Sequence, residues 1–416
     1  MLVFDRKFYF AVFLLLMSVF GVVHSKTQRH ERVPPPQNEP VAAKDKGGTA
    51  EARLIEIYNL MGSGRSREAL SKAAKLTEDV PNFQLAHLVY GDLLNARTRT
   101  IRALGNVPTD TVRNPNANTK LAELRNESLQ RIKAIRERPA PGTIPSQFLS
   151  LSTRNKHAIA IDASRSRLYL FENTTAGLKL VSDYYISVGK AGTVKSVEGD
   201  QRTPLGVYYI TSNLNPKSLK DLYGSGALPI NYPNILDTKR GKTGGGIWLH
   251  GTPHDQFSRA PQASDGCIVL TNPDLTRIIR TVEVRTTPVV IASELKWVAP
   301  QSLLSESKPF EDALFAWRDF KSTGNFDRVL SFYTADFNSF GKGIEQWTPA
   351  LKAEIMKAQG RNIQLKDVSY LRWTDSSDTM VVTFGEVADG SKAGVTKRQY
   401  WTRQGDQWKI FFEGVI

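Results

Sequence analysis

The spacing of apolar residues changes twice along this chain, and no single type of fold accommodates all three patterns. Between Glu51 and about Arg138 the apolar residues recur every three or four positions, which predicts amphipathic helices. From about Lys156 to residue 293 they form short runs and alternations, which predict strands. Helical spacing returns near residue 307, and four strand-like segments follow. We therefore expect an α+β protein with a helical region, a mainly β domain and a second α+β domain.

The first 49 residues are expected to export and tether the chain. Two basic residues precede an apolar stretch from Phe8 to Val23, which ends in small residues. The stretch has the length of a secretory signal and is short for a spanning helix, which needs about 20 residues. Residues 1–25 are therefore expected to be either a cleaved signal peptide or a retained inner-membrane anchor. Residues 26–49 are polar and proline-rich and predict a tether.

Residues 50–138 form the predicted helical region. Gly64, the run Glu68-Ala69-Leu70 and Pro81 loosely resemble a tetratricopeptide helix hairpin. The apolar residues expected on three helix faces are Leu54, Ile55, Tyr58 and Met61, then Ala69, Leu70, Ala73 and Leu76, and then Leu121, Leu124, Ile132 and Ile135. Prolines between residues 139 and 145 predict a linker.

Residues 156–293 form the predicted β domain, and residues 307–416 form the second α+β domain. The first has expected strands at 158–162, 167–171, 184–188, 207–211 and 288–291, and a helix at 272–282. A linker is expected near residues 299–308. The second domain begins with helices and continues with expected strands at 363–373, 379–387, 397–403 and 408–413.

The charge of the chain is strongly positive. Lys and Arg number 55 against 41 Asp and Glu, a formal charge of +14. No nucleic-acid-binding motif accompanies this excess, and an exported protein does not meet nucleic acid. We therefore expect no nucleic-acid partner, and the membrane surface and the cell wall remain as anionic partners.

Cys267 is the only cysteine in the chain, so an internal disulfide is excluded. It follows Ser264-Asp265-Gly266 and begins an apolar run. Another apolar run, ending at residue 249, leads directly into His250 and Gly251. If the two runs are neighbouring strands, a thiol and an imidazole meet, as a thiolate nucleophile and its base require. The alternative is a buried thiol that only fills the core.

Residues 156–293 resemble the L,D-transpeptidase (YkuD) catalytic domain family. The matching motifs are Thr203-Pro204-Leu205-Gly206, Tyr223-Gly224, Gly246-Ile247-Trp248-Leu249-His250-Gly251 and Ser264-Asp265-Gly266-Cys267-Ile268. Residues 307–416 resemble an NTF2-like domain. The order of the two domains resembles that of L,D-carboxypeptidases that trim peptidoglycan in curved and helical bacteria.

The resemblance implies a role for each matching residue. Cys267 is expected to be the nucleophile, His250 the general base and the Gly251 carbonyl the group that orients the imidazole. The backbone amides of Gly266 and Cys267 are expected to form the oxyanion hole. The residues expected to contact substrate are Tyr223, His254, Arg259, Ser264 and Asp265.

Asp265 departs from the family pattern, which usually has histidine two positions before the cysteine. A carboxylate beside a thiol raises the thiol pKa, which opposes its activation. Either Asp265 points away, or a cation such as Arg259 neutralises it, or the enzyme relies on His250 alone.

No metal or other cofactor is expected. His250 and His254 are four residues apart, as in some zinc sites. Gly251 and Pro253 stand between them, so they cannot share one helix face.

The function expected from these residues is acyl transfer on peptidoglycan stem peptides, in the periplasm or cell envelope. An L,D-transpeptidase would form cross-links through a thioester, and an L,D-carboxypeptidase would trim the tetrapeptide to a tripeptide. A wall-binding scaffold without activity and a thiol hydrolase that cuts another linkage of the wall are the other possibilities. The helical or NTF2-like region is expected to serve dimerisation or a protein partner.

Overall fold

The computed structural model describes residues 49–106, 115–391 and 393–416. The expected leader, anchor and tether lie outside the described residues. Within these three ranges, no helix combines the length and the apolar character needed to cross a membrane. Residues 49–416 form one compact unit.

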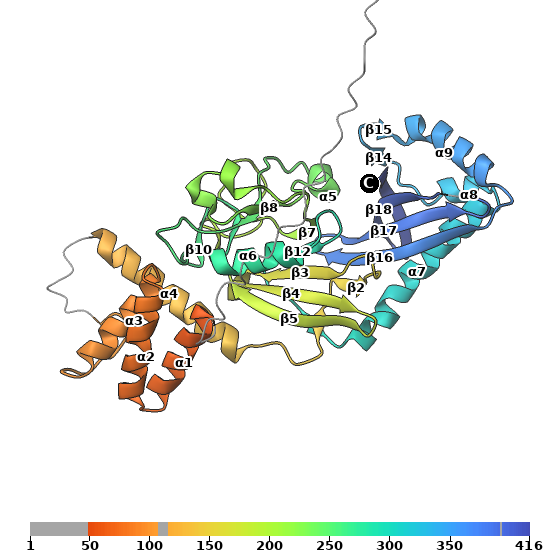
Figure 1. The fold of residues 1–416 in the computed structure, drawn as a ribbon. Coiled ribbons are helices and arrows are strands. Elements are labelled where there is room, and N and C mark those ends of the chain that lie inside the picture. The colour runs from red at the N-terminus through yellow and green to blue at the C-terminus, as the bar shows by residue number, and fades with distance from the viewer. Residues whose placement is uncertain (1–48, 107–114, 392) are drawn as a thin grey trace, which may run out of the picture. The chain divides into compact units, whose positions relative to one another are not determined.

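Four helices build the N-terminal part (Figure 1). They are α1 (Ala50–Gly62), α2 (Ser66–Asp79), α3 (Gln84–Asn95) and α4 (Pro115–Arg136). Ala69, Ala73 and Leu76 are buried as the sequence predicts. In α4 the expected apolar face is only half-buried, and the buried residues are Glu127, Ser128, Arg131 and Ala134. The predicted helix is present, and its most buried stripe is charged because Arg131 pairs there with Glu127 and Glu51.

A five-stranded sheet forms the centre of the β domain, in the order β5-β4-β3-β12-β7. Its strands are β3 (His157–Asp162), β4 (Arg167–Thr174), β5 (Gly177–Tyr185), β7 (Gly206–Tyr209) and β12 (Pro288–Ala292). The face with Ile159 and Ile161 packs on a core shared with smaller sheets and α6 (Asn272–Thr281). These smaller strands are β6 (Val188–Gly189), β8 (Ala227–Pro229), β9 (Trp248–His250), β10 (Gln262–Ser264) and β11 (Ile268–Val269), with a short helix α5 (Ile235–Lys239) beside them.

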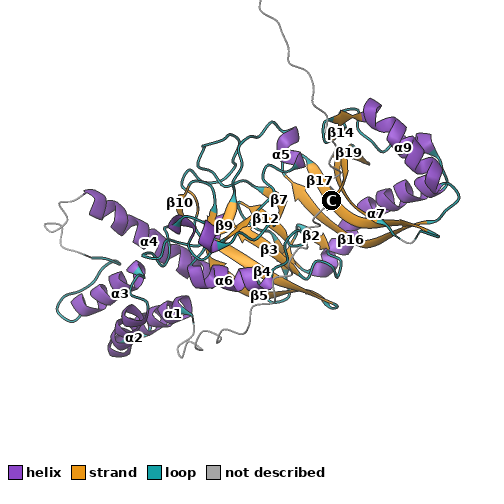
Figure 2. Cartoon of the chain, turned by 45° about the horizontal axis from the view of Figure 1, so that its top comes forward, coloured by secondary structure: helices purple, strands orange, loops and turns teal. Residues whose placement is uncertain are grey.

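A second five-stranded sheet, in the order β19-β18-β17-β16-β2, belongs to the C-terminal part (Figure 2). Its long strands are β16 (Ile363–Thr374), β17 (Asp378–Ala388), β18 (Val395–Gln404) and β19 (Gln407–Val415). One face packs on α7 (Pro300–Ser322), α8 (Phe326–Leu330) and α9 (Ile344–Ala358), and the hairpin β14 (Asn338–Ser339) and β15 (Lys342–Gly343) lies beside β19. The mixed helix and strand content and the three parts confirm the predicted fold class.

The two expected linkers are structured, and they join the two sheets. β1 (Ile144–Pro145) pairs with β13 (Trp297–Val298), and β2 (Phe148–Ser150) adds an edge strand to the C-terminal sheet. Residues 300–308 are the first turns of α7. The remaining faces of the two large sheets share one apolar core, which holds Tyr209 and Val290 on one side and Leu371 and Val381 on the other. The prolines that predicted linkers start or flank these short elements instead.

Candidate active site

The strands that carry His250 and Cys267 are neighbours. β11 runs parallel to β9, with Ile268 opposite Leu249 and Val269 opposite His250. Cys267 directly precedes β11, so it lies two positions, about 7 Å along the strand, from the partner of His250. Among the described residues, the thiol donates its hydrogen bond to the Gly246 carbonyl at 3.4 Å. The resting structure therefore brings thiol and imidazole onto adjacent strands without a hydrogen bond between them.

His250 is held in one tautomer. Its Nδ1 lies 2.7 Å from the Gly251 carbonyl oxygen, which only accepts hydrogen bonds, so Nδ1 carries the proton and Nε2 keeps a lone pair. The side chain is 4% exposed. Burial lowers the pKa of His250 to about 4, aided by the positive charge of Arg259 and opposed by the Gly251 hydrogen bond. At neutral pH the imidazole is an uncharged base.

Tyr223 and Gly251 fix the position of this imidazole. The Tyr223 ring stands almost perpendicular to the His250 ring, with centroids 5.1 Å apart, and its carbonyl accepts the Gly251 amide at 3.0 Å. A Cβ at Gly251 would lie 2.0 Å from Asn272 Oδ1. Asn272, which sequence analysis did not single out, also receives the Ser225 amide and donates to the Thr252 carbonyl. Only glycine therefore fits beside the base.

The turn before Cys267 is held by hydroxyl groups. The Ser264 hydroxyl donates to the Cys267 carbonyl at 2.6 Å and accepts the Gly266 amide at 3.1 Å. Thr203, from the first matching motif, donates to the Gly266 carbonyl at 2.9 Å. Gly266 has φ +123°, and a Cβ there would lie 2.7 Å from the Arg202 carbonyl oxygen. Ser264 is buried and positions the turn, and the Gly266 amide is already engaged in it.

Asp265 points into solvent and has a cationic partner. Its side chain is 81% exposed, and Lys190 Nζ lies 2.8 Å from its carboxylate. The neutralising cation is thus Lys190, which sequence analysis missed, rather than Arg259. Burial raises the pKa of the Cys267 thiol and Asp265 adds to this, whereas the Trp248 backbone hydrogen bond, Arg259 and Lys195 lower it. The thiol is therefore protonated at rest.

The positive charge of Arg259 acts on both candidate catalytic groups. Its positive charge lowers the pKa of Cys267 and of His250. Burial lowers the pKa of Arg259 itself. Among the described residues, its half-buried guanidinium has no hydrogen-bond or ion-pair partner. An unpaired guanidinium near the thiol is suited to bind a carboxylate or carbonyl oxygen of a substrate.

The loop of residues 252–261, which carries Arg259, is fastened to the helical part. The Phe257 amide donates to the Asn82 carbonyl at 3.2 Å, and the Phe257 ring packs on Phe83 with centroids 4.3 Å apart. Ser258 donates to Glu127 at 2.7 Å. Helices from outside the β domain therefore position this loop.

His254 lies on the same loop and is separate from the base. Its side chain is exposed and pairs with Asp221 of the short 3₁₀ turn Asp221–Tyr223, while His250 is buried. In the described part of the chain, no group of three or more His, Cys, Asp or Glu side chains is arranged to hold a metal ion.

Comparisons with known proteins agree with this division of the chain. Residues 156–291 match the family model of the L,D-transpeptidase catalytic domain (YkuD), and residues 310–414 match that of the Cds6 C-terminal NTF2-like domain. No curated protein matches the sequence.

Two solved structures show the same fold over most of the described chain. Bdellovibrio bacteriovorus Bd1075 is 23% identical, with a TM-score of 0.56, and the match covers 66% of this chain and 98% of that one. The helical cell shape determining protein Pgp2 from Campylobacter jejuni is 23% identical, with a TM-score of 0.51, covering 69% of this chain and 99% of that one.

Proposed function

Residues 156–291 belong to the L,D-transpeptidase catalytic domain family, and from this premise we propose that the chain cross-links peptidoglycan stem peptides through a thioester on Cys267. A peptidoglycan-acting enzyme of this family works in the cell envelope, which agrees with the exported leader that the sequence predicts. The observation that carries the proposal is the neutral His250, with Nε2 free, on the strand beside Cys267.

The first half of the reaction forms the acyl-enzyme. Cys267 Sγ attacks the carbonyl carbon of the L-centre of diaminopimelate in a tetrapeptide stem, and His250 Nε2 takes the thiol proton. The bond to the terminal D-alanine breaks, and its nitrogen takes the proton from the imidazolium. Because the thiol pKa is raised and that of His250 is about 4, a free ion pair is unfavourable at rest. Proton transfer therefore accompanies the attack of sulfur on the carbonyl.

Arg259 and the backbone amides stabilise the charge that develops in this step. Arg259 favours the thiolate by its charge and is placed to contact the stem. The Cys267 amide is the first oxyanion donor. The Gly266 amide joins it only after releasing the Ser264 hydroxyl.

The acyl-enzyme is resolved by an amine or by water. In cross-linking, an amine of a second stem attacks the thioester carbonyl, the C–S bond breaks, and the amine proton returns to sulfur through His250. In the alternative, a carboxypeptidase, water attacks and a tripeptide is released. Tyr223 packs against the base, whereas His254 and Asp265 are exposed and are left as the candidates to contact the stem.

Acylation by a carbapenem tests the nucleophile. The intact protein is expected to gain the mass of one carbapenem, and the Cys267→Ala protein is expected to gain none. Cys267 is the single cysteine, so no other thiol contributes. If the unmodified chain gains no adduct, the scaffold interpretation replaces the enzyme.

Purified tetrapeptide muropeptides separate the two enzymatic outcomes. New 3–3 linked dimers are expected from a transpeptidase. Tripeptide without dimers would instead establish the carboxypeptidase.

A further inference from the structure

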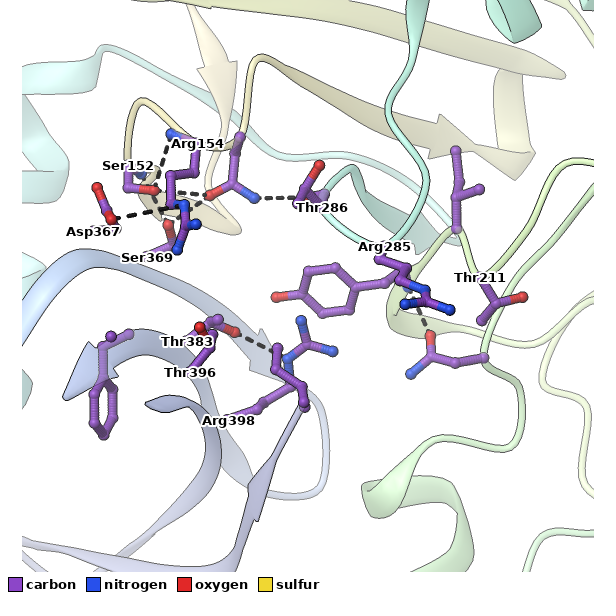
Figure 3. Close-up of a pocket in the computed structure, with 17 residues that line it drawn as sticks. Ser152, Arg154, Thr211, Arg285, Thr286, Asp367, Ser369, Thr383, Thr396 and Arg398 are labelled. Carbon is purple, nitrogen blue, oxygen red and sulfur yellow. Dashed lines mark hydrogen bonds and ion pairs between the residues drawn. The ribbon is translucent and has the colours of Figure 1, made fainter. Parts of the chain in front are cut away.

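A cavity of about 720 Å³ lies between the catalytic and the C-terminal sheets, and neither Cys267 nor His250 lines it. Its walls come from β7 and nearby loops on one side and from β16, β17 and β18 on the other (Figure 3). Its volume lies in the range of small-molecule sites, which is about 300 to 1,000 Å³.

The C-terminal sheet changes character where this cavity begins. On one face of β17 and β18, the cross-strand pair Val381–Tyr400 is apolar and packs on the catalytic domain. The next pairs on the same face, Thr383–Arg398 and Gly385–Thr396, line the cavity. Side chains on one face of a sheet alternate along each strand, so this face would continue apolar if it served only to pack the two sheets. The change to polar residues indicates that this part of the face does more than pack the two sheets together.

Arg398 places a buried positive charge in this cavity. It is 9% exposed, and its guanidinium carbon lies 3.5 Å from the centre of the Tyr209 ring. Its Nε donates to the Thr383 hydroxyl at 2.9 Å. It makes no ion pair with any described residue. A buried guanidinium without a carboxylate is costly, since burial favours pairing of charges.

Tyr209 adds an unsatisfied hydroxyl to the same cavity. The residue is 4% exposed, and within the described part of the chain its buried hydroxyl has no hydrogen-bond partner. Its backbone amide donates to Asn231 Oδ1 at 2.6 Å, and its ring lies under the Arg398 guanidinium. Native proteins rarely leave such a group unpaired, so this hydroxyl is suited to a partner that enters the cavity.

The rim of the cavity is also basic. Arg154 and Arg285 line it and are exposed, and Asp367 is the one acidic side chain among the described lining residues. Arg154 lies 3.7 Å from Asp367, and no described residue forms an ion pair with Arg285 or Arg398, although the terminal residue Ile416 also lines the cavity. Figure 3 shows Arg285 and Arg398 on opposite sides of the same space.

We propose that this cavity binds the free carboxylate of a short peptide, with Arg398 as its counter-ion and the Tyr209 hydroxyl as a hydrogen-bond donor. One guanidinium fork and one hydroxyl match a planar carboxylate. The threonine, serine and asparagine side chains around them suit peptide amides. If the chain acts as proposed, stem peptides are the available ligands of this class, and this last step rests on the proposed function.

Peptide binding to the full-length Cys267→Ala protein tests the site without turnover. Isothermal titration is expected to show that a stem tetrapeptide binds and that its C-terminal amide binds at least tenfold more weakly. Tyr209→Phe keeps the ring under Arg398 and removes one hydroxyl, so about a tenfold loss of affinity is expected. Arg398→Gln is expected to lose more, about a hundredfold.

Arg403→Gln is the matched control, because Arg403 lies on the same strand β18, is exposed and does not line the cavity. It is expected to bind the tetrapeptide as the Cys267→Ala parent does. Equal affinities for Tyr209→Phe, Arg398→Gln and the parent would overturn the site, as would tighter binding of inorganic phosphate. Carbapenem acylation of the unmodified protein is scored separately, so failure of the proposed chemistry and failure of this site are distinguishable.

Discussion

The catalytic domain contacts its two neighbours through interfaces of opposite chemistry. Against the helical part, Glu51 of α1 pairs with Arg131 of α4 and with Arg167 of β4, and all three are largely removed from water. Against the C-terminal part, two sheet faces share an apolar core that includes Phe148, Phe171 and Leu371. Buried charges need exact partners, whereas apolar contact needs only shape and area.

The helical part contacts the loop of the candidate active site, whereas the C-terminal part contacts the opposite face of the central sheet. The charged interface continues into Ser258 and Phe257, on the loop that carries Arg259 beside the thiol. The apolar interface lies behind the central sheet and opens into the cavity with Arg398. The helical part is thus coupled to the site through a buried charge pair, one hydroxyl and one ring contact. The C-terminal part is held by apolar packing spread over many residues.

Arg131→Met is expected to have the largest effect on stability. It leaves Glu127 and Glu51 without the cation that both contact, and breaking a buried ion pair costs about 3–5 kcal/mol. Urea unfolding followed by circular dichroism measures the loss. Arg65→Met removes an exposed pair with Glu68 and is the control, expected to cost less than about 0.5 kcal/mol. Equal losses for both variants would show that the charged interface is not the critical contact.

Leu371→Ala tests the apolar interface in the same assay. Leu371 is fully buried between the two sheets, and truncating a buried leucine costs about 2–5 kcal/mol. Here we expect a value near 3 kcal/mol, because an apolar face can partly close over the lost methyl groups. The loss is expected to be the same at pH 7 and at pH 4, whereas the loss for Arg131→Met is expected to shrink as Glu51 is protonated at low pH. A pH-dependent loss at Leu371 would contradict the contrast between the two interfaces.

Acid is expected to loosen the charged interface before the apolar one. Burial alone would raise the pKa of Glu51, but Arg131 and Arg167 outweigh it and hold this pKa below the usual value. A lowered carboxyl pKa gives stability that is present above the ordinary value of 4.5 and lost as pH falls through the folded value. Amide exchange in α1 and α4 should therefore accelerate below about pH 4.5, while β12, which has no carboxylate and lies in the apolar core, should stay protected. At pH 5 the His250 imidazole is still neutral, so activity is retained there.

The strands and most helices could be predicted because their patterns are local. The four long strands β16 to β19 of the C-terminal sheet lie within a few residues of their predicted ranges, and the hairpin at Gly405-Asp406 joins β18 to β19 as expected. The apolar runs before His250 and after Cys267 were predicted as strands, but only the structure shows that these strands are neighbours.

The features that the sequence could not predict depend on contacts between residues far apart in the chain. Glu127 and Arg131 of α4 form a polar stripe at helical spacing, which sequence alone would place in solvent. The stripe is buried because Glu51, 80 residues earlier in the chain, pairs with Arg131. Lys190 could not be assigned to Asp265, since the pairing of β6 with β10 brings the two segments together. The end of the first expected linker became strand β1 for the same reason, because it forms only by pairing with β13.

Ser258→Ala is expected to have the smallest effect on stability and to report on the coupling of the helical part to the site. It removes one hydrogen bond to Glu127, which Arg131 still neutralises, so the cost is about 1 kcal/mol. The loop with Arg259 gains freedom, and muropeptide turnover should fall about two- to threefold, whereas Ser305→Ala on the exposed side of α7 should leave it unchanged. Ser258→Ala could instead lower stability and leave turnover intact. The charged interface would then hold the helices against the catalytic domain without positioning Arg259.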